Sequence, residues 1–117
     1  MKQLSALTRK ADYASVYRRG RAWKEDLMVM KVLPTSLSLT RYGLSVTRKV
    51  GNAVKRNRLK RLLREIIRLQ LLKPGWDVVF IVRPEAVDAD YHRLEKSVTG
   101  LLAQAQLLNH DDKTARS

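Results

Sequence analysis

The sequence contains no cysteine. This absence excludes disulfide bonds, thiolate metal sites and cysteine nucleophiles. Long apolar runs are also missing, because the longest wholly apolar segments, such as Val78–Val82, fall far short of the roughly 18 residues that a membrane-spanning helix needs. No signal peptide is recognisable. We therefore expect a cytoplasmic protein without a membrane partner.

Acidic residues are scarce, and they are scarcest in the first part of the chain. The 117 residues include 24 Lys and Arg but only 11 Asp and Glu, so the formal net charge is +13. Residues 1–68 hold 18 basic and 4 acidic side chains, whereas residues 69–117 hold 6 and 7. Solubility alone needs no such segregation. The asymmetry therefore predicts that one face of the protein binds a polyanion.

A hydrophobic fraction of 44% is ordinary for a globular protein and predicts one folded α+β domain over residues 1–117, with polar residues 109–117 as a flexible tail. Periodicity and turn residues predict the elements. In chain order they are a helix between Thr8 as N-cap and Gly20, an extended region Trp23–Leu33 that can be split, a strand Arg41–Thr47, a helix from Gly51-Asn52 to about Leu72, a buried strand Trp76–Val82, and a last helix capped by Asp88 or Asp90.

The helix after Gly51 separates its apolar and basic residues by angle. At roughly 100° per residue, one side carries Leu59, Leu62, Leu63, Ile66 and Leu69. The opposite side carries Arg56, Asn57, Lys60, Arg61, Arg64 and Arg68. Like charges at i,i+4 cost about 0.2–0.5 kcal/mol per pair. A merely solvated face normally interleaves Glu, so the stripe favours a phosphate-binding face, in which Asn57 can make a directed hydrogen bond.

The region around this helix resembles a known family. The segment from Tyr42 to Glu65, with Arg56-Asn57-Arg58 inside the basic helix, is similar to the signature of the bacterial ribonuclease P protein component. Asp12-Tyr13, Val16-Tyr17 and Gly20 resemble that family's first helix, and Asp77–Arg83 followed by Pro84 resembles its last strand. More than twenty ordered positions carry the resemblance, which extends over most of the chain.

The resemblance implies a single domain with a mixed four-stranded sheet, three helices, and the basic helix in a left-handed βαβ crossover. It implies the protein subunit of a ribonucleoprotein that removes the 5′ leader of precursor tRNA, with Mg²⁺ held mainly by the RNA subunit and the substrate. The expected partners are ribonuclease P RNA and precursor tRNA, and no DNA. The residues expected to bind the RNA subunit are Arg48, Lys49, Asn52, Arg56, Asn57, Arg58, Lys60, Arg61, Arg64 and Arg68.

A second site is expected for the single-stranded leader, between the first helix and the sheet. Tyr13 and Tyr17 are four residues apart and share a helix face, so they could stack on unpaired bases or simply be core aromatics. Their match to the family's aromatic positions favours stacking. By the same resemblance Lys31 would hold the leader by charge, and Arg18 is placed with this set.

Catalytic residues are not expected on the protein itself. His92 and His110 are far apart in the sequence, and the acids near Asp88 lack a third metal ligand. Two other interpretations remain open. A ribosomal protein or RNA-assembly factor fits the size and charge equally well, whereas a helix-turn-helix DNA-binding protein would need a helix where Arg41–Thr47 predicts a strand.

Overall fold

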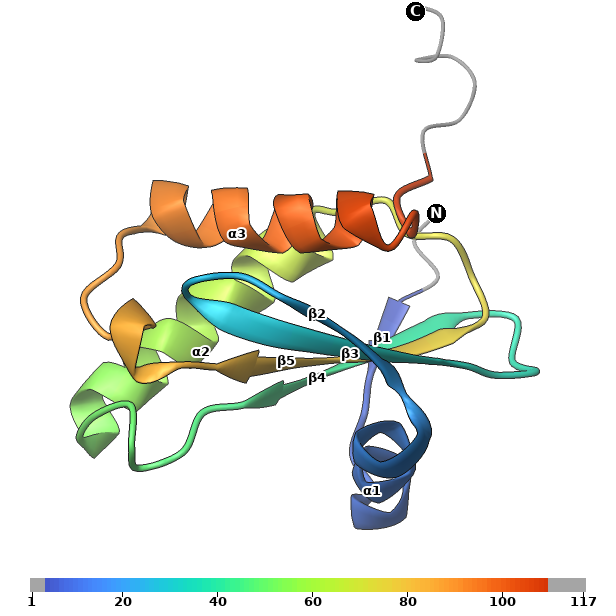
Figure 1. Ribbon diagram of the computed structural model, residues 1–117, viewed down its shortest axis with the longest axis horizontal. Helices are drawn as coiled ribbons and strands as arrows, with labels where there is room; N and C mark the ends of the chain where they lie inside the picture. The colour runs from blue at the N-terminus through green and yellow to red at the C-terminus, as the bar shows by residue number, and fades with distance from the viewer. Residues whose placement is uncertain (1–3, 110–117) are drawn as a thin grey trace, which may run out of the picture.

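The computed structural model describes residues 4–109, which form one sheet with helices on both of its faces. Figure 1 shows α2 and α3 on one face and α1 on the other. The elements in chain order are β1 (Leu4–Ala6), α1 (Lys10–Arg19), β2 (Arg21–Lys24), β3 (Met28–Pro34), β4 (Thr40–Ser45), α2 (Ala53–Arg68), β5 (Trp76–Val82), a 3₁₀ turn (Pro84–Ala86) and α3 (Tyr91–Gln104).

The sheet is mixed, as expected, but it has five strands rather than four, in the order β1-β4-β5-β3-β2. The unexpected strand, β1, pairs parallel to β4 over three residues, which is too short to produce a recognisable alternation. The extended region before Pro34 is split into β2 and β3, which pair antiparallel. The α+β class is confirmed.

Helix α2 connects β4 to β5, which are adjacent and parallel, so the three elements form the expected βαβ unit. The left-handed sense of this crossover stays a prediction from the resemblance. The side chain of Asn52 accepts a hydrogen bond from the Lys55 amide at 3.0 Å, and this cap begins the helix at Ala53. The helix ends at Arg68, so the prediction that it continues to about Leu72 is wrong.

The main core lies between the sheet and the pair α2 and α3. Alternate residues of β3 and β5 face it, with Met28, Met30 and Phe80 fully buried. Helix α2 contributes Leu59, Leu63 and Ile66 as predicted, together with Ile67. Leu69, predicted to lie in the core, is 62% exposed because the helix has ended and the residue sits at its C-cap.

Helix α1 covers the other face of the sheet through a smaller cluster of Leu7, Val16 and Val79. Its N-cap is Arg9, not Thr8, and no side chain bonds the cap. At the start of α3 the cap is Asp90, whose carboxylate accepts from the Arg93 amide at 2.9 Å. Within residues 4–109 no helix combines the length and apolar character needed to cross a bilayer.

Candidate RNA-binding surfaces

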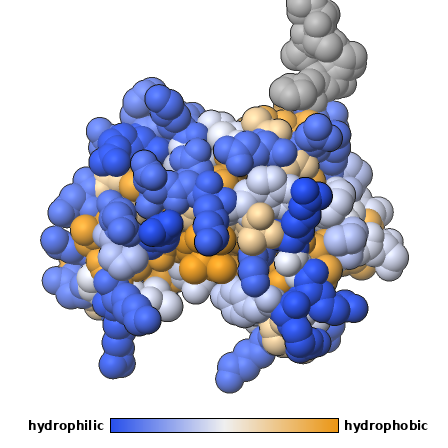
Figure 2. All heavy atoms as spheres, in the orientation of Figure 1, coloured by the Kyte–Doolittle hydropathy of each residue, from blue (hydrophilic) through white to orange (hydrophobic). Residues whose placement is uncertain are grey.

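The basic face of α2 lies in solvent, opposite its buried leucines. Asn57, Arg61, Arg64 and Arg68 are exposed, while Arg56 and Lys60 are half-buried at the boundary with the core. Figure 2 shows hydrophilic side chains over much of the molecular surface in the orientation of Figure 1, with hydrophobic side chains visible between them. The predicted angular division of the helix is therefore present, with its charges turned outward.

The turn that precedes α2 adds two more exposed cations, Arg48 and Lys49. Two of the residues predicted to bind RNA, Asn52 and Arg56, also make hydrogen bonds within the protein at the start of α2. The side-chain oxygen of Asn52 caps the helix, and Arg56 Nε donates to the Gly51 carbonyl oxygen at 3.1 Å. This bond orients the Arg56 side chain back toward the turn, at the start of the basic face.

Arg58 is directed away from the basic face. Its Nη2 donates to the Ala89 carbonyl oxygen at 2.9 Å, in the loop between β5 and α3. Lys55 points to the same loop, with its Nζ 3.5 Å from the Asp88 carboxylate. The structure thus separates Arg58 and Lys55 from the cations of the basic face, and the Arg58 bond fixes the helix against the loop.

We expect Arg58→Ala to lower the free energy of unfolding by about 1–2 kcal/mol, because it removes a charged donor from a part-buried carbonyl. The matched control is Arg61→Ala, which removes the same charge from an exposed position three residues away and should change stability by no more than about 0.5 kcal/mol. Urea unfolding followed by circular dichroism measures both. Equal stability of the two variants would contradict a fixing role for Arg58.

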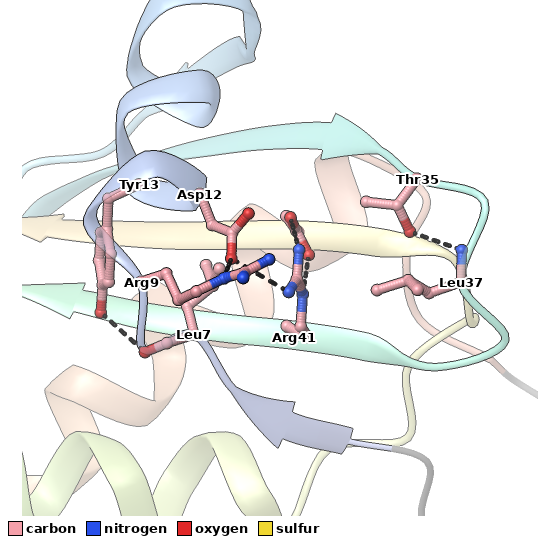
Figure 3. Close-up of polar contacts among 8 residues, drawn as sticks. Leu7, Arg9, Asp12, Tyr13, Thr35, Leu37 and Arg41 are labelled. Atoms are coloured by element: carbon pink, nitrogen blue, oxygen red, sulfur yellow. Dashed lines mark hydrogen bonds and ion pairs between the residues drawn. The ribbon is translucent and has the colours of Figure 1, made fainter.

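The two tyrosines of α1 lie together, with ring centroids 6.3 Å apart and planes inclined by 45°. Tyr17 is 39% exposed, whereas Tyr13 is half-buried and its hydroxyl donates to the Leu7 carbonyl oxygen at 3.5 Å (Figure 3). Burial raises the pKa of Tyr13, so its hydroxyl stays protonated at neutral pH. A Cβ at Gly43 would come within 2.5 Å of that hydroxyl oxygen, so only glycine lets the ring lie against β4.

Lys31 also reaches α1. Its Nζ donates to the Tyr17 carbonyl oxygen at 2.6 Å, near the C-terminal end of the helix. Arg18, which follows Tyr17 in α1, is exposed to solvent. The four residues predicted for the leader site, Tyr13, Tyr17, Arg18 and Lys31, therefore come from α1 and from the strand on which it packs.

One cavity is lined by members of both predicted sets of residues. It has a volume of about 160 Å³ and is called the shared cavity below. Tyr13 contributes from α1, and Lys60 and Arg64 contribute from the basic face of α2. The full lining is Ala6, Leu7, Tyr13, Tyr42, Gly43, Leu44, Lys60 and Arg64. The contribution of β1 to this wall, Ala6, was missed, because a three-residue strand leaves no pattern in the sequence.

An ion network beneath α1 was also missed by sequence analysis. Arg41 on β4 donates through Nε and Nη2 to the two carboxylate oxygens of Asp77 on β5, at 2.8 and 2.6 Å. Its Nη1 donates to Asp12 Oδ2 on α1 at 3.2 Å (Figure 3). The hydrogen bonds to Asp77 raise the pKa of Arg41 further, so it stays charged. The available signal was the presence of a charged residue, Asp77, inside an otherwise apolar strand.

No group of three or more His, Asp or Glu side chains gathers in a metal-binding arrangement within the part of the chain that the structure describes. His92 is exposed on α3, and His110 lies outside the described residues. Asp90 caps a helix and Asp88 is exposed beside Lys55. These side chains do not fit a protein cage for Mg²⁺.

Comparison with solved structures gives the same architecture. The Staphylococcus aureus RNase P protein superposes with a TM-score of 0.80 at 27% identity, covering 89% of this chain and 97% of that chain. The RNase P protein from Thermotoga maritima superposes with a TM-score of 0.77 at 27% identity, covering 85% and 96%. A strand, β4, precedes the basic helix, so the helix-turn-helix alternative is excluded.

Comparison of sequences identifies the family. The sequence model of the family described as Ribonuclease P matches residues 1–106. The ribonuclease P protein component of Dehalococcoides mccartyi (strain CBDB1) is 46% identical over 116 residues, covering 98% of this chain and 97% of the relative. That of Clostridium botulinum (strain Loch Maree) is 38% identical over 106 residues, covering 88% and 96%. The chain belongs to the bacterial ribonuclease P protein component family, the protein subunits of an endoribonuclease whose other component is RNA.

Proposed function

We propose that this subunit docks on ribonuclease P RNA through the basic face of α2, and holds the 5′ leader of precursor tRNA along α1. The observation that carries the proposal is the shared cavity, in which Tyr13 stands beside Lys60 and Arg64. A nucleic acid strand that contacts Tyr13 has the cations Lys60 and Arg64 within reach of its phosphates. The two surfaces can therefore act on one continuous RNA assembly.

The α2 side of the proposal is supported by uncompensated charge. Within residues 4–109 no ion pair joins Lys60, Arg61 or Arg64 to an acidic side chain. Arginine guanidinium groups suit the bidentate recognition of phosphate. The expected RNA contacts also include Arg48, Lys49, Asn57 and Arg68. The other three residues predicted to bind the RNA subunit each make a hydrogen bond within the protein: Asn52, Arg56 and Arg58.

The leader side is supported by the exposed ring of Tyr17 and the part-exposed ring of Tyr13. Aromatic rings can stack on any unpaired base, which is how a protein holds single strands of varied sequence. Lys31, whose Nζ donates to the Tyr17 carbonyl oxygen, places a positive charge beside the backbone of α1 at Tyr17. Arg18 adds an exposed charge on the solvent side of α1.

The catalytic contribution proposed for the protein is electrostatic. The RNA subunit and the substrate are both polyanions, and a protein of net charge +13 between them lowers their repulsion. We propose that Mg²⁺ is held mainly by the RNA subunit and the substrate, because the described residues do not fit a cage for it. The protein would act in the cytoplasm, on precursor tRNA.

A leader-length series tests the proposal. Precursor tRNAs with progressively shorter leaders, and mature tRNA, are bound to RNA subunit alone and to the reconstituted holoenzyme under non-cleaving conditions. We expect the protein to tighten binding of precursors with long leaders and to have little effect on mature tRNA. An equal gain for every leader length, including none, would overturn the assignment of the leader to α1.

A further inference from the structure

Helix α1 is attached to the sheet by few contacts. Of its ten residues only Val16 is buried, and it packs in the small cluster with Leu7 and Val79. Leu33 and Ile81 of the sheet and Tyr13 of the helix also pack against this cluster, whereas Tyr17 is 39% exposed. Besides this one apolar cluster, polar contacts connect the helix to the sheet near both of its ends.

The contact at the C-terminal end is the bond from Lys31 to the Tyr17 carbonyl oxygen. The contact at the N-terminal end is the ion network of Arg41 with Asp77 and Asp12 (Figure 3). Arg41 and Asp77 are direct partners in the parallel register of β4 and β5, so their side chains leave the same face of the sheet side by side. That face is the one on which α1 packs.

The geometry of the network gives Arg41 one orientation. The Asp77 side chain is only 4% exposed, and both of its oxygens are bonded by Arg41. Breaking either bond would leave a buried carboxylate oxygen without a donor, which costs free energy. The guanidinium is planar, so its nitrogen atoms keep fixed directions relative to one another. With Nε and Nη2 fixed, Nη1 points in one direction, and Asp12 Oδ2 lies there at 3.2 Å. Arg9 also approaches Asp12, at 3.4 Å, but its side chain is 77% exposed and does not connect the helix to the sheet.

We propose that Arg41 is a positioning residue for the leader site. Held by Asp77, it fixes the first turn of α1 through Asp12, and so sets where the adjacent Tyr13 stands relative to β4 and the shared cavity. The inference rests on the proposed function, since it matters for activity only if α1 binds the leader. In this proposal Arg41 and Asp12 do not contact RNA themselves. They nevertheless control how much more tightly the holoenzyme binds precursor tRNA than mature tRNA.

The test uses Asp12→Asn in the holoenzyme reconstituted with a bacterial ribonuclease P RNA. Asparagine keeps the size of the side chain but removes the negative charge to which Arg41 Nη1 donates. We expect the ratio of precursor to mature tRNA affinity to fall about 3- to 10-fold. Affinity for the RNA subunit should be unchanged. Hydrogen exchange in the free protein should become faster in α1 and not in α2.

Two matched variants accompany it. Arg9→Ala removes the other cation beside Asp12 and should leave the affinity ratio at the wild-type value. Asp12→Glu keeps a carboxylate within reach of Arg41, so the ratio of precursor to mature tRNA affinity should stay close to the wild-type value. Equal loss of RNA-subunit affinity and precursor selectivity in Asp12→Asn would show a general structural defect and overturn the inference.

The outcomes separate this inference from the proposed function. If Tyr13→Ala lowers the affinity ratio but Asp12→Asn does not, the positioning role is wrong and the leader site stands. If the wild-type protein gives no leader-dependent gain, the leader site is wrong and the positioning role falls with it. If Asp12→Asn lowers the ratio while α1 exchange is unchanged, Asp12 acts on RNA directly and the inference is overturned.

Discussion

Replacing Arg61 and Arg64 together by alanine is expected to weaken binding of the protein to ribonuclease P RNA about 30-fold at physiological salt. Both side chains are exposed on the basic face of α2. Each phosphate contact contributes roughly 0.9 to the slope of log affinity against log salt. About six contacts along the helix predict a slope of roughly −5, and the double variant should reduce its magnitude by about 2.

The control for this variant is the double replacement of Arg93 and Lys96 by alanine. It removes the same charge from exposed positions on α3, outside the predicted RNA-binding set. Filter binding or fluorescence titration at several salt concentrations measures both slopes. If the α3 variant lost as much affinity and slope as the α2 variant, RNA binding would follow total charge and not the basic face.

The second large effect is expected from replacing Tyr13 and Tyr17 together by alanine. Stacking on an aromatic side chain is worth about 1–3 kcal/mol per base, so removing two rings should lower affinity for precursor tRNA by at least about 30-fold. Affinity for mature tRNA and for the RNA subunit should hardly change, because the rings lie on α1 and not on α2. Equilibrium binding to the reconstituted holoenzyme gives all three constants.

Replacing both tyrosines by phenylalanine is the matched control. The rings remain, and only the hydroxyls are lost, including the long bond from Tyr13 to the Leu7 carbonyl oxygen. Precursor affinity should stay within about 3-fold of wild type, since stacking needs only the ring. If the phenylalanine variant lost as much as the alanine variant, hydrogen bonding and not stacking would hold the leader.

The sequence was most informative where the structural cause is local and repeats with a fixed period. The division of α2 into a core side with Leu59 and Leu63 and a basic side with Arg61 and Arg64 follows from helix geometry alone. The strand Trp76–Val82 was recognisable because it is apolar on both faces. Both predictions needed no knowledge of distant residues.

The sequence could not predict contacts that join distant residues. The Arg58 guanidinium donates to the Ala89 carbonyl oxygen, 31 residues later, and no periodicity in the sequence indicates that partner. Arg41 and Asp77 are 36 residues apart and meet only through the register of β4 and β5. The shared cavity, likewise, needs β1, α1, β4 and α2 assembled, and no single segment indicates it.

The central claim is that this subunit lets a catalytic RNA act on precursor tRNA by supplying positive charge and a leader site. The most direct test is leader removal by ribonuclease P RNA, measured over a range of Mg²⁺ concentrations with and without the protein. The account predicts that the protein shifts the Mg²⁺ dependence to lower concentration and that the shift requires the leader. An unchanged Mg²⁺ dependence with the folded wild-type protein present would contradict it.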